Sequence, residues 1–109
     1  MDSILTSIKK LLGITEEYTH FDTDLIIHIN SVFATLTQIG VGPSEGFVIV
    51  DENDNWEQFT DDNILIESVK SYIYLKVKLL FDPPTSSAVS ESYKQMINEF
   101  EWRLNVAAE

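Results

Sequence analysis

The sequence predicts a mainly α protein: a small four-helix bundle with one long loop, or a short β-hairpin, between the second and third helices. With 109 residues the chain suits one domain and is too short for two ordinary ones. Its hydrophobic content of 44% is enough for a packed core. Apolar residues recur at helical spacing in four segments that glycine or proline separates. We therefore expect one domain over residues 1–109, with helices at about 3–12, 22–39, 61–81 and 87–106 and a loop at 40–60.

The first helix is expected to begin after Asp2 or Ser3, because either side chain can accept a hydrogen bond from the first turn. Gly13 suits the position just after its end. Lys9 and Lys10 are expected to point away from the core. The apolar face consists of Ile4, Leu5, Ile8, Leu11 and Leu12.

The second helix is expected over 22–39, with Gly40 at the terminating position. Asp22 and Asp24 suit the positive end of its dipole. Ile27 lies opposite the apolar stripe and indicates a second contact surface. The stripe itself consists of Leu25, Ile29, Val32, Leu36 and Ile39.

Residues 40–60 are expected to leave the helical pattern, because three glycines and Pro43 lie at the start of the segment. The run 47–50 has β-type residues, and a turn follows it. Trp56 and Phe59 are isolated apolar anchors. They either pin the loop to the bundle or contact a partner.

The third helix is expected to begin at Thr60 as its N-cap and to stop before Pro83 and Pro84. Its main apolar face consists of Leu65, Ile66, Val69, Tyr72, Ile73, Val77 and Leu80. Four further apolar residues lie off that face: Ile64, Tyr74, Leu75 and Phe81. A helix that is apolar on several sides is covered from several sides, either as the central helix or by neighbouring subunits.

The fourth helix is expected over 87–106. Its inner stripe consists of Val89, Tyr93, Met96, Ile97, Phe100 and Leu104. Trp102 lies almost opposite Tyr93 on the helix, among polar residues. It either lies flat over a neighbouring helix or the loop, or anchors a protein interface, where tryptophan is enriched.

The formal net charge of −11 argues against nucleic-acid binding and against adsorption to an anionic membrane, because only 7 residues are Lys or Arg. Six acids and no base occur in one short segment: Asp51, Glu52, Asp54, Glu57, Asp61 and Asp62. The simplest interpretation is a solvated acidic loop.

The chain offers few catalytic groups. Four residues near the start of the second helix could approach a metal: His20, Asp22, Asp24 and His28. Helix capping and the edge of the apolar stripe explain them better. The segment from 51 resembles the opening of an EF-hand loop, but Trp56 stands where that loop needs glycine. No nucleophile elbow or phosphate-binding glycine loop is present, so we expect no enzyme and no cofactor.

Cysteine is absent, which excludes disulfides and thiol chemistry. No apolar run has the length of a signal peptide or a membrane span. We therefore expect a soluble protein that begins at its own Met1.

Several stretches together resemble the head–tail connector (adaptor, or head completion) family of tailed bacteriophages. They are the opening at 3–14, the stretches 19–24, 27–33 and 40–43, the Trp56-x-x-Phe59 pair, the ending 76–84 and the stretch 100–104. The likeness spans nearly the whole chain. It is a likeness of sequence texture and supplies no site residues.

The resemblance implies a structural virion protein at the head–tail junction, present in the host cytoplasm during assembly. It implies a closed ring, commonly of about a dozen copies, beneath the portal protein. Such a ring extends the DNA channel, through which DNA passes without specific binding, and offers a platform for stopper or tail proteins. The isolated chain can be a monomer.

We assign surfaces on this basis. The candidate portal or partner interface comprises Trp102, Val106, Trp56 and Phe59. The candidate subunit–subunit surface comprises Ile27, Ile64, Tyr74, Leu75 and Phe81. The candidate channel-facing acids are Asp51, Glu52, Asp54 and Glu57. Two alternatives stay open: an acidic DNA mimic that inhibits a host DNA-binding protein, and a small metal-binding enzyme.

Overall fold

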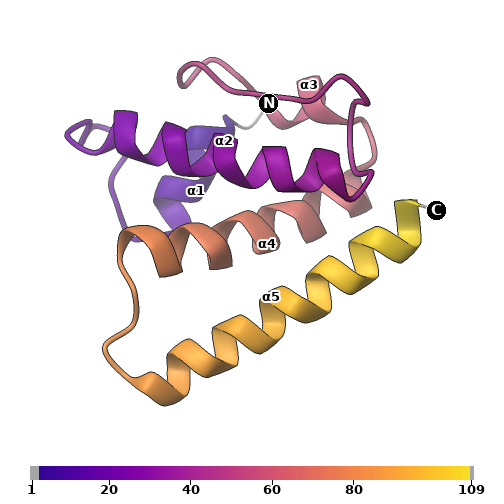
Figure 1. The fold of residues 1–109 in the computed structure, drawn as a ribbon. Helices are drawn as coiled ribbons and strands as arrows, with labels where there is room; N and C mark the ends of the chain where they lie inside the picture. Colours follow the sequence, from indigo (N-terminus) through magenta and orange to yellow (C-terminus); the bar gives the residue numbers. More distant parts are fainter. Residues whose placement is uncertain (1–2, 109) are drawn as a thin grey trace.

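The computed structural model of the chain describes residues 3–108. Within that range the fold is mainly helical and contains no strand, which confirms the predicted class (Figure 1). The helices are α1 (Ile4–Leu11), α2 (Asp22–Gln38), α3 (Trp56–Phe59), α4 (Asn63–Phe81) and α5 (Ser87–Ala108).

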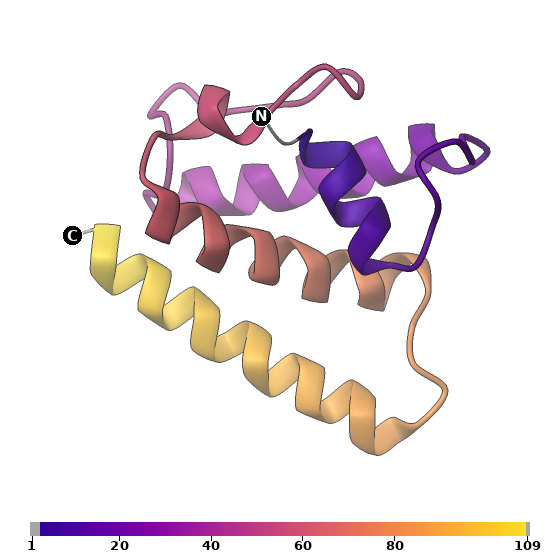
Figure 2. The ribbon, with the colours of Figure 1, turned by 180° about the vertical axis from the view of Figure 1, so that it is seen from behind.

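Helix α4 is the centre of the bundle. It runs antiparallel beside α2, while α1 crosses the pair on one side and α5 follows α4 on the other (Figures 1 and 2). Because α4 contacts three helices, apolar residues on several of its sides are covered within one subunit. Leu75 illustrates this: it is 5% exposed, so its assignment to the subunit–subunit surface is wrong.

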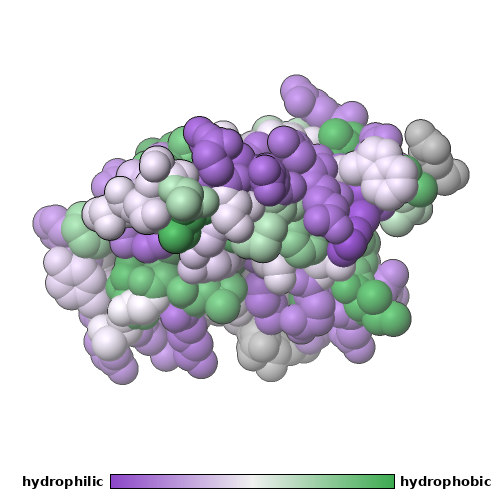
Figure 3. All heavy atoms as spheres, turned by 90° about the horizontal axis from the view of Figure 1, so that it is seen from below, coloured by the Kyte–Doolittle hydropathy of each residue, from purple (hydrophilic) through white to green (hydrophobic). Residues whose placement is uncertain are grey.

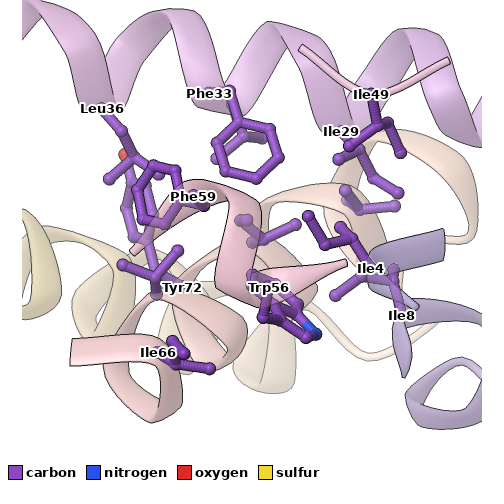
Figure 4. Close-up of a cluster of buried hydrophobic side chains, with 14 of the residues drawn as sticks. Ile4, Ile8, Ile29, Phe33, Leu36, Ile49, Trp56, Phe59, Ile66 and Tyr72 are labelled. Carbon is purple, nitrogen blue, oxygen red and sulfur yellow. The ribbon is translucent and has the colours of Figure 1, made fainter. Parts of the chain in front are cut away.

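The core lies between α1, α2, α4 and the long loop. Phe33 and Leu36 point from α2 towards Phe59 and Tyr72, as Figure 4 shows. Apolar burial of this extent is the main contribution to the stability of a domain of this size.

Helix boundaries follow local hydrogen bonding. Ser3 is the N-cap of α1 and accepts from the amide of Thr6, as the sequence predicts. The N-cap of α4 is Asp62 rather than Thr60, because its carboxylate accepts from two amides of the first turn. Asp2 lies outside the described residues.

Lys9 was expected to point away from the core, and this expectation is wrong. The side chain is 2% exposed, and its ammonium lies 2.8 Å from Asp22 Oδ1. It also donates to the carbonyl of Glu16 at 3.0 Å. These partners satisfy the buried charge, and they tie α1 to the start of α2.

The loop between α2 and α4 contains the short helix α3, which the sequence pattern did not predict. Asn55 and Gln58 form a reciprocal capping box at its start. The run 47–50 does not form a strand; the only β-bridge among the described residues pairs Ser3 with Asn55.

Candidate assembly surfaces

The outer face of α5 carries a large exposed aromatic side chain. Trp102 is 68% exposed and Val106 is 48% exposed. Trp102 therefore does not lie flat over a neighbouring helix. Seen from the side of α5, hydrophobic groups alternate with hydrophilic ones (Figure 3). Leaving an indole in water is unfavourable, so this position suits a protein contact.

Two isoleucines on other helices are also exposed. Ile27 on α2 is 61% exposed and Ile64 on α4 is 83% exposed. Because α2 and α4 run antiparallel, these residues near the two helix starts lie towards opposite ends of the pair (Figure 1). Tyr74 and Phe81 are half-buried, and Phe81 packs edge-on against the Phe21 ring at 5.1 Å between centroids.

Helix α5 packs on the bundle through fewer residues than its sequence stripe predicts. Only Ile97 and Leu104 are buried, whereas Val89 and Met96 are exposed. The reason is that α5 packs mainly against α4, so a narrow strip of it is covered. Tyr93 and Phe100 are half-buried against the core.

A cluster of three polar side chains joins α4 to α5. The Tyr72 hydroxyl, on a fully buried side chain, donates to Glu101 Oε2 at 2.8 Å. Lys76 Nζ donates to the same hydroxyl at 3.4 Å and lies 4.0 Å from the Glu101 carboxylate. Burial raises the pKa of Tyr72 far above its usual range, and the hydrogen bond to negatively charged Glu101 raises it further.

A tyrosine pair, Tyr74 and Tyr93, also joins these two helices. The pKa of Tyr74 is raised mainly by a side-chain hydrogen bond with Tyr93, and burial adds to the shift. The polar contacts of Tyr72 and Tyr74 are not readable from the apolar periodicity, because tyrosine counts there as an apolar residue.

The loop aromatics pack inside the subunit. Trp56 and Phe59 are 3% and 5% exposed, so their assignment as partner contacts is wrong for the folded chain. The Trp56 indole donates to Ser7 Oγ at 3.1 Å, and the Phe59 ring packs against Phe33 at 5.1 Å. Gly42 has a positive φ, and a Cβ there would overlap the Phe59 ring. The two aromatics pin the loop.

The acids of the loop divide into two groups. Asp54 accepts from the amides of Val50 and Asp51, and Asp51 accepts from the amide of Asn53, so both fold the turn. Glu52 and Glu57 are exposed. Sequence reasoning missed this division, although Asp at a turn is a usual signal for such bonds.

Residues 3–108 contain no cluster of three or more His, Asp or Glu side chains that could hold a metal ion. Asp22 pairs with Lys9, and the His20 ring packs edge-on against Phe21 at 4.8 Å. No helix in the described range is long and apolar enough to span a membrane.

The described residues form a small helical bundle with exposed apolar side chains on α2, α4 and α5. The family described as phage connector protein matches residues 4–109, and the chain belongs to this phage head–tail connector family. The resemblance read from the sequence is confirmed. No curated protein and no solved structure matches.

Membership of the family gives the chain a structural role as a phage connector, in a class of non-enzymatic proteins of the virion. It implies assembly with the portal and other head or tail proteins. It gives no support to the DNA-mimic alternative.

Proposed function

We propose that the protein is an adaptor subunit that assembles as a ring beneath the portal, extends the DNA channel and provides the platform for stopper or tail proteins. The observation that carries the proposal is that Trp102 is exposed on α5, the outermost helix of a chain that belongs to the connector family. Trp102 and Val106 contact the portal protein, which covers their apolar surface.

Neighbouring copies pack side by side through Ile27 and Ile64, with Tyr74 and Phe81 at the edges of the contact. A ring needs two different surfaces on each subunit, one for each neighbour. The two exposed isoleucines on different helices fit that requirement. The ring closes on the portal, and the isolated chain is a monomer because copies with a net charge of −11 repel one another.

The channel-facing acids are Glu52 and Glu57, with Asp51 and Asp54 shaping the turn that presents them. Negative charge on a channel wall repels the phosphate backbone, so passing DNA does not adhere. After assembly in the host cytoplasm, the ring stays in the virion at the head–tail junction.

The test is electron microscopy of the chain mixed with the portal protein of its phage. We expect a ring of added density on one face of the portal, whereas a portal without added density contradicts the proposal.

Replacing Trp102 tests the surface. We expect Trp102→Ala to weaken portal binding about thirtyfold or more, as truncation of a hot-spot tryptophan costs at least about 2 kcal/mol. Leu11→Ala is the control, because Leu11 on α1 is 47% exposed and no partner contact is assigned to it. Equal binding by the two variants, measured by calorimetry, excludes Trp102 from the interface.

A further inference from the structure

The segment 47–50 runs beside α2 with side chains that alternate between core and solvent. Ile49 is 2% exposed, whereas Val48 is 64% and Val50 is 72% exposed. The half-buried Phe47 ring packs on Phe33 at 4.9 Å. A period of two is that of a β-strand with one face on a core.

Asn30 on α2 takes the place of a neighbouring strand along one edge of this segment. Its Nδ2 donates to the carbonyl of Ile49 at 2.9 Å, and its Oδ1 accepts from the amide of Ile49 at 2.7 Å. A residue paired in an antiparallel sheet exchanges two bonds in the same way. This edge is therefore satisfied.

The opposite edge is open at Val48. Within residues 3–108 its amide and carbonyl have no hydrogen-bond partner, whereas the amide of Val50 is bound by Asp54. Successive residues of an extended chain direct these groups to opposite edges, so those of Val48 point away from Asn30. An unpaired edge with exposed β-branched side chains is a template for another strand.

The charge around the segment selects the occupant. Glu45 lies two residues before the segment and is exposed. Asp51 and Glu52 follow the segment directly. A second copy would bring its own acids opposite these, which is unfavourable, whereas a basic strand complements them.

We propose that segment 47–50 is an open β-edge to which another protein of the head–tail junction adds an extended segment that carries basic and β-branched residues. Main-chain bonds to Val48 give the pairing, and the flanking acids select the partner. The inference rests on the proposed function only in naming a junction protein as the partner.

The first experiment compares Val48→Pro with Val48→Ala in titrations against the purified portal and stopper proteins of the same phage. Proline removes the free amide without breaking a native hydrogen bond, while alanine keeps it. We expect Val48→Pro to weaken binding to one of the two proteins roughly tenfold or more, and Val48→Ala by no more than about threefold. Equal affinities for Val48→Pro and wild type with both proteins overturn the inference.

A second pair of variants keeps the test valid if proline disturbs the loop. Val48→Lys and Val48→Glu place similar side chains at an exposed position and differ in sign of charge. A basic partner strand is repelled by the lysine, so this variant should bind at least about threefold more weakly than the glutamate variant at low salt. The reverse order, or no difference, contradicts a basic partner.

Hydrogen exchange of the Val48 amide separates this inference from the proposed function. We expect this amide to be protected in the complex with the partner and unprotected in the chain alone, where the amides of Ile49 and Val50 are already hydrogen-bonded. Protection of the Val48 amide in concentrated solutions of the chain alone makes a second copy the occupant and overturns the inference. A ring beneath the portal in which this amide stays unprotected with every partner overturns it too, while the proposed function stands; a portal without a ring removes the function instead.

Discussion

At the scale of single residues, the Lys9–Asp22 ion pair places a charged ammonium in the interior of the fold. The lysine is enclosed, its partner is partly accessible, and a main-chain carbonyl completes the site. Desolvation of the ammonium is offset only while both partners are present. The pair therefore fixes how the connection after α1 returns to α2.

We predict that Lys9→Ala lowers the free energy of unfolding by about 2–4 kcal/mol, because it leaves the Asp22 carboxylate without its cation and opens a cavity. Lys10→Ala is the matched control on an exposed neighbour and should change stability by less than about 0.5 kcal/mol. Urea denaturation of both variants gives the comparison. Similar losses for the two lysines would show that the pair is not a stabilising contact.

At the scale of elements, the loop between α2 and α4 depends on one side chain of α2. Asn30 holds the buried Ile49 through both of its main-chain groups. Replacing Asn30 leaves these groups without partners, which is costly in a buried position. Ser31 beside it is exposed and serves as a control.

We predict that Asn30→Ala destabilises the protein by about 2–3 kcal/mol and raises hydrogen exchange in 47–50, while Ser31→Ala leaves both almost unchanged. Mass spectrometry of exchanged peptides measures the local effect. Exchange in the loop that is the same in both variants would mean that the aromatics alone hold it.

The junction of α4 and α5 should respond to alkaline pH. In the unfolded chain Tyr72 loses its proton near its ordinary value of 10.0, whereas the folded state keeps it. Above pH 10 the folded state thus binds more protons than the unfolded one, so stability falls as pH rises. Below pH 10 the contribution is fully present.

We predict that the free energy of unfolding falls less steeply above pH 10 in Tyr72→Phe than in the wild type. One tyrosine contributes at most about 1.4 kcal/mol per pH unit to this fall. The two proteins differ only in this hydroxyl, so the difference between the two pH curves reports on the junction at Tyr72. Thermal melts from pH 8 to about 11 provide the measurement. Parallel curves would show that the hydroxyl does not contribute to this junction.

The four long helices could be predicted because each has a periodic apolar stripe and a recognisable boundary. Helix α3 could not, since four residues are too few to show a helical period. The burial of Lys9 and Leu75 depends on which helices surround them, and periodicity along one helix does not contain that information. Among the surface assignments, Trp102 and Ile64 are exposed. The sequence left two interpretations open for Trp102 and for the loop aromatics; Trp102 is exposed, whereas the loop aromatics are buried.

At the scale of the whole molecule, the acidic charge has separable roles. Asp51, Asp54 and Asp62 bind main-chain amides, so neutralising them would disturb the turn and the start of α4. The exposed Glu52 and Glu57 can be changed without breaking such bonds. Replacing Glu52 and Glu57 therefore tests whether the channel wall is acidic at this loop.

We predict that phage carrying Glu52→Gln and Glu57→Gln together eject DNA more slowly, because the neutral side chains no longer repel phosphates that pass close to them. Glu16→Gln with Glu17→Gln is the matched control: it removes the same charge from exposed positions between α1 and α2. Ejection is followed by dye fluorescence on receptor-triggered particles of equal DNA content. A slower rate confined to the first pair places these acids at the channel, and the difference from wild type should widen at low salt, where the charges of the wild-type acids are screened least. If both pairs eject at the wild-type rate, the acids of the loop face away from the DNA and serve only to keep the chains apart in solution.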